Sequence, residues 1–317
     1  MMEERFEGAD EFVVFAGTAN PALADAVARE LGITLAQSRV ERFPDGELSV
    51  RLLESVRRKE VYLIQPTAPP VNDRLMELLA FADGCRRSAA ARVTAVVPYF
   101  GYARADRRNR RREPITASMV AGLIQSVGID HVLTVDLHSP QIEGFFQVPV
   151  DSLSAVAPVC DALAGTLPPD LTVVSPDAGR VKTASEFAER LRAPLAIIMK
   201  RRESGTRTEV THLVGDVRGR ACLIVDDMIS TGGTLVSSIH ALREAGAREF
   251  QIAATHGLLV GDACARLRDA GVTRVVVTDT VDVPERQWSA LHVVSLAPLL
   301  AEAIRRMIRR ESVSEMG

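Results

Sequence analysis

Short apolar runs alternate with amphipathic helical patterns along the chain. The runs have the length and the uniform apolar character of strands buried in a parallel sheet. Repeated alternation of strand and helix predicts an α/β fold with mostly parallel sheets flanked by helices. The expected strands are 12–16, 61–65, 93–97, 131–135, 172–175, 195–199, 221–225, 250–254, 274–278 and 292–294. The expected helices are 21–31, 72–88, 116–127, 179–191, 234–245, 262–270 and 297–310.

A weak internal repeat predicts two tandem domains of the same kind. Residues 91–101 are similar to 247–257, and residues 128–136 are similar to 271–279. The two offsets, 156 and 143 residues, differ by 13, and the Arg-rich segment 102–114 accounts for an insertion of that size. The expected domains are residues 1–154 and 155–317, each with its own sheet and helices.

Composition and charge narrow the class of protein. The chain has 317 residues, 38 basic and 41 acidic, and a net charge of −3, so it has no overall signature of nucleic-acid binding. The first residues lack the apolar core of a signal peptide, and no apolar run reaches the length of a membrane span. Four widely spaced cysteines are expected to be buried thiols of a reducing compartment: Cys85, Cys160, Cys222 and Cys264. A cytoplasmic protein without a membrane or nucleic-acid partner is expected.

The stretch 222–234 contains the strongest candidate chemistry. An apolar run ends at Asp226 and Asp227, and a loop of hydroxyl and glycine residues leads into a helical pattern. Ligands of open α/β sheets bind beyond the carboxyl ends of the strands, and a helix N-terminus favours a phosphate. Two carboxylates accept hydrogen bonds from neighbouring hydroxyls, so the stretch suits a sugar phosphate. The alternative is an ordinary turn in which a Ser or Thr caps the helix.

This stretch resembles the binding loop for 5-phosphoribosyl 1-diphosphate. Type I phosphoribosyltransferases and ribose-phosphate diphosphokinases share the loop. The resemblance assigns ribose 5-phosphate binding to the following residues: Asp226, Asp227, Ser230, Thr231, Gly232, Gly233 and Thr234.

Two segments of the first half offer contacts for a nucleotide. The turn 42–47 contains an aromatic ring and two hydrogen-bond acceptors around Pro-Asp-Gly. Such a turn either binds a nucleobase, by stacking and hydrogen bonds, or is a plain hairpin. Six arginines fall within residues 104–112, after an expected strand end. Such a cluster is a polyphosphate site, a solvated face or an RNA-binding surface, and its compactness favours the polyphosphate.

Three further segments follow expected strand ends. His138 stands two residues after Asp136, as a metal ligand or as a satisfied polar residue. Asp177 begins an acid–glycine–helix pattern that is able to reach Mg²⁺, an ion that takes one or two protein ligands and completes its shell with phosphate oxygens and water. Segment 200–205 is a basic turn or a mobile loop that closes over a phosphoryl group.

Taken in order, these segments resemble ribose-phosphate diphosphokinase from about residue 12 to residue 314. The resemblance implies two type I phosphoribosyltransferase-like domains and transfer of the diphosphoryl group of ATP to O1 of ribose 5-phosphate, which supplies nucleotide biosynthesis. One alternative is a type I phosphoribosyltransferase, which would leave the N-terminal half without a role. Another is a catalytically silent regulatory subunit. The intact motif residues argue against it: His138, Asp177, Lys200 and Arg202.

The resemblance also implies a role for each motif residue. Phe43, Asp45 and Glu47 would hold the adenosine, from a neighbouring subunit of a homohexamer built from dimers, and Arg104 would contact ATP. His138 and Asp177 would bind Mg²⁺, with His138, Lys200 and Arg202 catalytic. Three positions depart from the family pattern: Ser230 where Asp is common, Ala105 beside the ATP arginine, and Arg180 in place of a second glycine.

A regulatory phosphate site is implied as well. Ser55 and Arg57, with Ser312 and Ser314 in the tail, match the site at which the family binds activating phosphate and inhibitory ADP. Hydroxyl donors and a guanidinium suit such an anion. The altered tail, which includes Glu315, is expected to weaken this binding.

Overall fold

The computed structural model describes residues 11–108, 110–204, 207–283 and 287–316, and for 200–204, 207–211 and 315 it describes the backbone alone. Two compact units divide the chain. The first contains residues up to Ser154, Thr280–Asp282 and the segment from Ser295 onward. The second contains Ala155–Asp279 and Val283–Val294.

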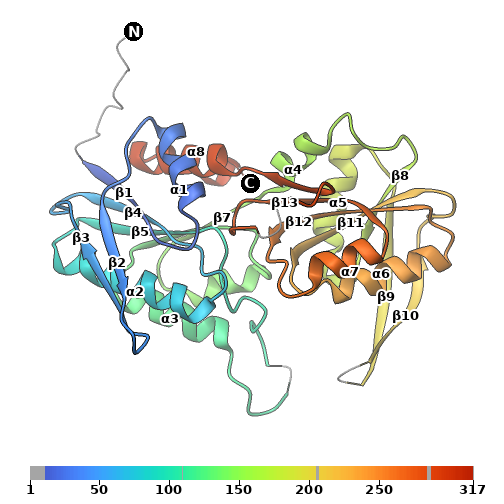
Figure 1. The fold of residues 1–317 in the computed structure, drawn as a ribbon, viewed down its shortest axis with the longest axis horizontal. Coiled ribbons are helices and arrows are strands. Elements are labelled where there is room, and N and C mark those ends of the chain that lie inside the picture. The colour runs from blue at the N-terminus through green and yellow to red at the C-terminus, as the bar shows by residue number, and fades with distance from the viewer. Residues whose placement is uncertain (1–10, 109, 205–206, 284–286, 317) are drawn as a thin grey trace, which may run out of the picture. The chain divides into compact units, whose positions relative to one another are not determined.

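Five parallel strands form the sheet of the first unit, in the order β1-β4-β5-β6-β7. The strands are β1 Phe12–Ala16, β4 Glu60–Ile64, β5 Arg92–Val97, β6 His131–Val135 and β7 Val150–Leu153. Helices α2 (Val71–Arg87) and α3 (Thr116–Ser126) lie on one face, and α1 (Pro21–Leu31) and α8 (Ala297–Arg309) lie on the other (Figure 1). Short 3-10 helices span Pro140–Phe145 (η1) and Ser314–Met316 (η3). Buried side chains of alternate strand positions pack against α2 and α3 to form one core: Leu63, Ala95, Leu78, Phe81, Val120 and Ile124.

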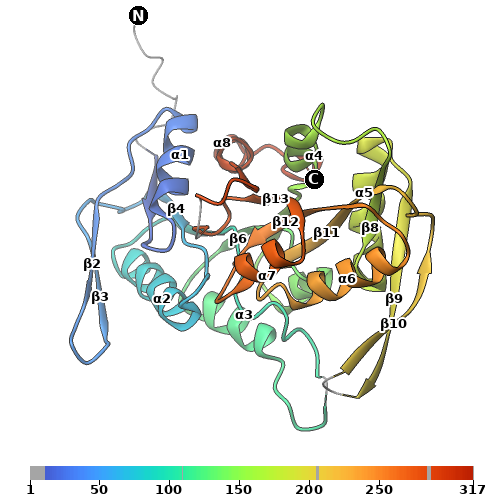
Figure 2. The same cartoon turned by 45° about the vertical axis from the view of Figure 1, so that its right-hand side comes forward.

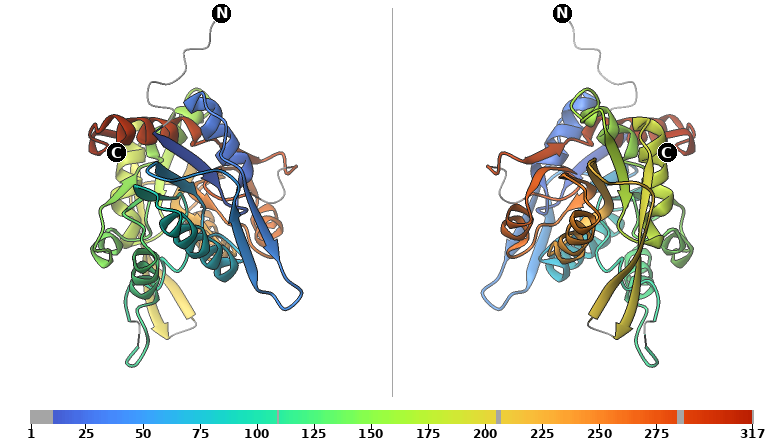
Figure 3. Two further views of the ribbon diagram at one scale, coloured as in Figure 1. Left: turned by 90° about the vertical axis from the view of Figure 1, so that its left-hand side faces the viewer. Right: turned by 90° about the vertical axis from the view of Figure 1, so that its right-hand side faces the viewer.

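A two-stranded antiparallel hairpin, β2 (Ser38–Arg42) with β3 (Leu48–Leu52), forms a separate small sheet in the first unit. Figure 3 shows it in blue as an arm that extends away from the main sheet. The Pro-Asp-Gly turn predicted near residues 44–46 forms its tip, where Gly46 adopts a φ of 93°. The turn is therefore carried on a hairpin.

The second unit has a seven-stranded sheet in the order β10-β9-β8-β11-β12-β13-β14, in which only β9 and β10 pair antiparallel. The strands are β8 Leu171–Ser175, β9 Leu195–Ser204, β10 Arg207–Val214, β11 Ala221–Ile229, β12 Glu249–Gly257, β13 Val272–Thr278 and β14 Leu291–Val294. Helices α4 (Val156–Leu163) and α5 (Val181–Leu191) lie on one face, and α6 (Gly233–Glu244) and α7 (Ala263–Asp269) on the other (Figures 1 and 2). The 3-10 helix η2, Ala178–Arg180, precedes α5.

The strand orders β1-β4-β5-β6-β7 and β8-β11-β12-β13-β14 match one to one. The segments that repeat in sequence lie on β5 and β12 and on β6 and β13. The expected α/β fold with two mostly parallel sheets is therefore confirmed.

The last helix departs from the expected division at residue 155. Helix α8 groups with the first unit instead of with the rest of 155–317. Its residues Leu300 and Ile304 are buried, and Arg305 donates from Nη2 to the carbonyl of Glu30 at 2.9 Å. Helix α8 therefore packs against the N-terminal helix α1.

Each predicted strand and helix is present to within a few residues, but several elements were not predicted. The hairpin β2–β3, which the sequence offered only as an alternative for the Pro-Asp-Gly turn, consists of half-buried and exposed residues, and β10 is polar at most positions, so neither has the apolar run of a buried strand. Strand β7 and helix α4 are short and were passed over. All four cysteines are buried free thiols, as expected. Within the described part of the chain, no helix is long and apolar enough to cross a membrane.

Candidate active site

Asp226 and Asp227 belong to β11 itself, which continues to Ile229 instead of ending before them as the sequence suggested. Backbone pairing with β12 supports this extension, since Asp226 is aligned with Ala254 and Met228 with His256. Strand pairing therefore fixes the backbone of the two residues that carry the carboxylates, near the carboxyl end of a central strand. Asp227 also donates its backbone N–H to Asp226 Oδ1 at 2.9 Å.

Arg180 bridges the two carboxylates. Its Nε lies 3.4 Å from Asp226 Oδ1 and its Nη2 lies 3.1 Å from Asp227 Oδ2. The side chains are 15%, 14% and 8% exposed for Arg180, Asp226 and Asp227. Burial, and next the adjacent charge of Asp227, raise the pKa of Asp226 well above its usual range, while Arg180 opposes that rise. A cation thus partly offsets two neighbouring negative charges.

The loop from Ser230 to Thr234 leads into α6. Gly232 is the N-cap with a φ of 75°, a conformation that favours glycine, and an added Cβ would lie 3.5 Å from Leu267. No side chain caps this helix, so the alternative of an ordinary Ser or Thr cap is wrong. Thr231, Gly233 and Thr234 are exposed around the helix start. Helix N-terminal N–H groups and the helix dipole favour an anion at this position.

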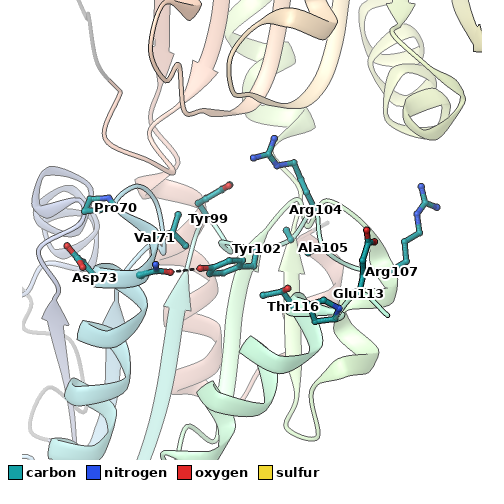
Figure 4. Close-up of a pocket in the computed structure, with 13 residues that line it drawn as sticks. Pro70, Val71, Asp73, Tyr99, Tyr102, Arg104, Ala105, Arg107, Glu113 and Thr116 are labelled. Atoms are coloured by element: carbon teal, nitrogen blue, oxygen red, sulfur yellow. Dashed lines mark hydrogen bonds between the residues drawn. The ribbon is translucent and has the colours of Figure 1, made fainter. Parts of the chain in front are cut away.

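A cleft of about 720 Å³ opens in the first unit between the starts of α2 and α3. Figure 4 shows the Tyr102 ring between Val71 and Thr116, with Arg104 and Arg107 rising from the same loop. The Tyr102 hydroxyl is hydrogen-bonded to Asn72. The predicted ATP residue Arg104 and the substituted Ala105 both line this cleft. The cleft combines aromatic walls with cations, a combination that suits a phosphorylated ligand.

Phe43, Asp45 and Glu47 meet at the tip of the β2–β3 hairpin. Phe43 N–H donates to the Glu47 carbonyl at 2.8 Å, and Glu47 N–H donates to Asp45 Oδ1 at 3.1 Å. The Phe43 ring is 46% exposed. At the base of the tip, Arg42 pairs with Asp73 of α2 at 3.1 Å, and Asp73 also lines the cleft. The three predicted adenosine contacts therefore share one exposed turn.

The two predicted metal ligands belong to different units. His138 follows β6 and is half-buried. Asp177 follows β8, and its Oδ1 accepts from Gly179 N–H at 2.9 Å. Among the described residues, no group of three or more His, Cys, Asp or Glu side chains is arranged around a metal position. Either side chain is able to serve as a single protein ligand of an ion that phosphate oxygens and water also coordinate, as Mg²⁺ commonly is.

Lys200 and Arg202 lie on β9, and their side chains fall outside the described part of the structure. The sequence suggested a loop at 200–205, of which residue 205 lies outside the described residues, whereas the backbone of 200–204 continues as a strand paired with β10, with Lys200 opposite Val210. The pairing supplies the backbone hydrogen bonds that a polar segment beyond the core needs.

The predicted regulatory residues are exposed and all belong to the first unit. Ser55 and Arg57 lie between β3 and β4. Ser312 and Ser314 follow α8, where the Ser312 carbonyl accepts from Arg306 Nη1 at 3.1 Å.

Sequence reasoning noted Arg180 only as an added charge near a metal ligand and missed its contact with the acid pair. The sequence pattern does place Arg180 after one strand, β8, and the acids at the end of another, β11. Finding the contact required the strand order, in which β8 and β11 are parallel neighbours and Val174 is aligned with Ile224, two residues before Asp226. Once that order is known, the contact follows from the length of an arginine side chain.

Comparisons with known proteins agree with this arrangement. A family profile described as the N-terminal domain of ribose phosphate pyrophosphokinase matches residues 12–128, and a profile described as the phosphoribosyl synthetase-associated domain matches 204–316. Ribose-phosphate pyrophosphokinase of Neisseria meningitidis serogroup A is 47% identical over 308 residues, 96% of this chain and 94% of its own length. The Caldanaerobacter subterraneus protein of the same name is 48% identical over 306 residues, 96% of each chain.

A solved structure extends the likeness to three dimensions. The crystal structure of phosphoribosylpyrophosphate synthetase from Mycobacterium smegmatis superposes with a TM-score of 0.89 at 42% identity, over 95% of this chain and 99% of that one. The profile match over residues 12–128 accounts for the half of the chain that a phosphoribosyltransferase would leave unexplained. The chain therefore belongs to the ribose-phosphate pyrophosphokinase family, whose members make 5-phosphoribosyl 1-diphosphate from ATP and ribose 5-phosphate.

Proposed function

We propose that the chain binds ribose 5-phosphate at Asp226–Thr234 and ATP at the first-unit cleft, and joins them by diphosphoryl transfer. The observation that carries the proposal is the acid pair on β11, a few residues before a helix start that no side chain caps. Carboxylates accept hydrogen bonds from the ribose diol, and the N–H groups of the α6 start donate to the 5-phosphate. The two ends of one sugar phosphate are thereby recognised by one segment.

ATP binding involves the other half of the chain. A cleft of about 720 Å³ lies within the range of nucleotide-sized pockets, and Arg104 at its edge supplies a cation for the phosphates. Phe43 would stack on the adenine, while Asp45 and Glu47 would accept hydrogen bonds from the adenosine. Because the hairpin tip is exposed, these residues are proposed to serve the ATP of a neighbouring subunit, within a homohexamer built from dimers.

The transfer step needs positioning and charge stabilisation more than covalent chemistry by the protein. O1 of ribose 5-phosphate attacks the β-phosphorus of ATP and loses its proton, and the bond from that phosphorus to the α–β bridging oxygen breaks, so AMP leaves with that oxygen. Lys200 and Arg202 would stabilise the charge that develops on the phosphoryl oxygens. His138 and Asp177 would hold Mg²⁺, which supplies further charge neutralisation when bound.

Two broader properties belong to the same proposal. Buried free cysteines agree with a reducing compartment, and a cytoplasmic location is proposed on that basis. Phosphate activation is proposed at Ser55, Arg57, Ser312 and Ser314, with the altered tail requiring more phosphate and giving weaker ADP inhibition.

One assay tests the central proposal. The protein is incubated with ATP, Mg²⁺ and ribose 5-phosphate in phosphate buffer, and AMP and 5-phosphoribosyl 1-diphosphate are measured. Formation of both in equal amounts is expected. Formation of neither would support a silent regulatory subunit. Repeating the assay over a phosphate titration with Arg57→Ala alongside tests the regulatory site, which would be vestigial if both proteins were fully active without phosphate.

A further inference from the structure

Arg180 is the feature of the second unit that the proposed chemistry leaves without a role. It lies on the 3-10 helix η2 after β8, and its guanidinium contacts both members of the acid pair on the neighbouring strand β11. Nε and Nη2 of the guanidinium make these contacts, one to an oxygen of each carboxylate. The planar group therefore fixes the orientation of both carboxylates at once.

The buried position makes displacement of Arg180 by the substrate unfavourable. A ribose diol is neutral, so a sugar that displaced Arg180 would leave two adjacent, mostly buried negative charges without the cation that contacts both of them. A carboxylate has about four lone-pair positions, so one contact with a guanidinium leaves it able to accept from a hydroxyl. Arg180 and the sugar hydroxyls are therefore able to contact the same two carboxylates at the same time.

We propose that Arg180 is a positioning residue for ribose 5-phosphate: it holds the carboxylates of Asp226 and Asp227 in the orientation that accepts the sugar hydroxyls. The role rests on the proposed function of the acid pair and adds to it a residue outside the β11–α6 segment. Since the guanidinium acts through the carboxylates, its loss should weaken sugar binding more than it slows the transfer step.

The charges around the pair allow a readout that a purely structural arginine would not change. The charges that act on Asp226 are Asp227 on its own strand, which raises its pKa, and Arg180, which lowers it. On the other side, His256 of β12 is buried opposite Met228, while Asp177 precedes Arg180 and Lys182 follows it as an exposed residue. Removing Arg180 lets the pair retain a proton to higher pH, so sugar binding should then depend on pH.

The experiment measures KM for ribose 5-phosphate and kcat, at saturating ATP and Mg²⁺, from about pH 7 to about pH 9, where a phosphate monoester is already largely dianionic. For Arg180→Ala we expect KM to rise about tenfold at the low end, the effect of roughly one pKa unit of lost interaction, and to recover toward the wild-type value as the pH rises. The KM for ATP should stay unchanged, and kcat should change less than KM. The wild type should show a flat KM over this range.

Three further variants complete the test. Arg180→Gln should behave as Arg180→Ala, and Arg180→Lys should recover part of the affinity because it restores the charge without the planar bridge. Arg248→Ala is the matched control, since it removes an arginine of the same unit from an exposed ion pair with Asp170, and it should leave KM and its pH profile unchanged. Calorimetric titration with ribose 5-phosphate in the presence of AMP gives the binding change independently of turnover.

The outcomes separate this proposal from the function beneath it. Unchanged or lower KM in Arg180→Ala, in an active enzyme, would overturn the positioning role and leave the proposed function intact. A raised KM with no pH dependence and no recovery in Arg180→Lys would likewise overturn it, because the arginine would then only support the local fold. A wild-type protein that forms no 5-phosphoribosyl 1-diphosphate would overturn the proposed function itself, and the role of Arg180 with it.

Discussion

The loops that follow the matching strands β1 and β8 both contact acidic side chains, which lie on a helix in the first unit and on a strand in the second. In the first unit, the loop after β1 reaches Glu77 of α2, where Thr18 donates its backbone N–H to Oε1 at 2.6 Å and its hydroxyl to Oε2 at 2.7 Å. Arg74, one turn earlier on α2, adds a contact at 3.3 Å. In the second unit, the loop after the matching strand β8 instead sends Arg180 to Asp226 and Asp227.

The loop after β1 uses its contact with an acid to fix the fold of the first unit. The loop after β8 contacts acids that we propose to bind a ligand in the second unit. Glu77 is 2% exposed, and donors from the protein contact both of its oxygens, so its contacts fix the β1–α1 loop. Asp226 and Asp227 put two like charges side by side, which is unfavourable for a purely structural role and needs a cation nearby. A pair of acids with one shared cation retains acceptor capacity for a ligand.

The largest effect is expected at the anchor. Glu77→Ala should lower the free energy of unfolding by about 3–5 kcal/mol, because it removes the buried carboxylate that accepts two hydrogen bonds from Thr18 and pairs with the half-buried Arg74. Urea unfolding of variant and wild type measures the change, with Asp83→Ala on the exposed side of the same helix as the control. A loss no larger than that of the control would mean that Glu77 does not anchor the loop.

The next largest effect concerns the hairpins that occupy matching places in the two copies, β2–β3 after α1 and β9–β10 after α5. We propose that the first contacts adenosine and the second the transferring group. Lys200→Ala should therefore lower kcat by roughly 10²–10³, the cost of one charge-stabilising donor, with little change in either KM.

Phe43→Ala should instead raise the KM for ATP. Steady-state kinetics of both variants distinguish these roles, and a raised KM with normal kcat in Lys200→Ala would limit Lys200 to ground-state binding.

Asp226→Ala should have an intermediate effect, on one substrate only. Loss of a hydrogen bond to a charged acceptor costs about 1.5–3 kcal/mol, which corresponds to a rise of roughly 10- to 100-fold in the KM for ribose 5-phosphate. ATP affinity should stay nearly unchanged, since ATP is assigned to the cleft of the other unit. Calorimetry with each substrate measures both, and an equal loss of ATP affinity would refute the assignment.

The smallest effect lies at the amino ends of the strands. His131 is buried, its Nδ1 lies 2.8 Å from Arg92 Nη2 and its Nε2 lies 2.8 Å from Asp151 Oδ2. Burial lowers the pKa of His131 in the folded state, with Asp151 opposing and Arg92 reinforcing the shift. The neutral ring is therefore stabilising above about pH 6.5, the unperturbed pKa, and this contribution falls as the pH drops below that value.

In the second copy, the repeat places Arg274 at the position of His131, and arginine keeps its charge over this range. At this matched position, the pH response should therefore occur in the first unit alone. Urea unfolding between about pH 7.5 and pH 5 should show the wild type losing at most about 1.4 kcal/mol per pH unit, and His131→Gln losing less. Identical pH profiles for the two proteins would show that His131 does not cause the loss.

The sequence predicted those parts of the molecule that depend on local pattern. Apolar runs located most strands of both sheets, and the Pro-Asp-Gly and Thr-Gly-Gly-Thr turns located two candidate binding loops. The alternation did not reveal β2, β3 and β10, because strands outside a buried sheet centre lack a continuous apolar run. It also did not reveal the contacts of Glu77 and Arg180, because these join different βα segments and depend on which strands are neighbours.

Helices α4 and α8 each belong to the unit other than that of the strand before them, and this affects the order in which the two units are synthesised. Helix α4 follows β7 in the chain but belongs to the second unit, and α8 follows β14 but belongs to the first. A ribosome therefore finishes the second unit before it makes the helix that covers α1 of the first. The first unit is begun first and completed last, so a fragment ending at Ser154 lacks α8, one of the two helices on one face of its sheet.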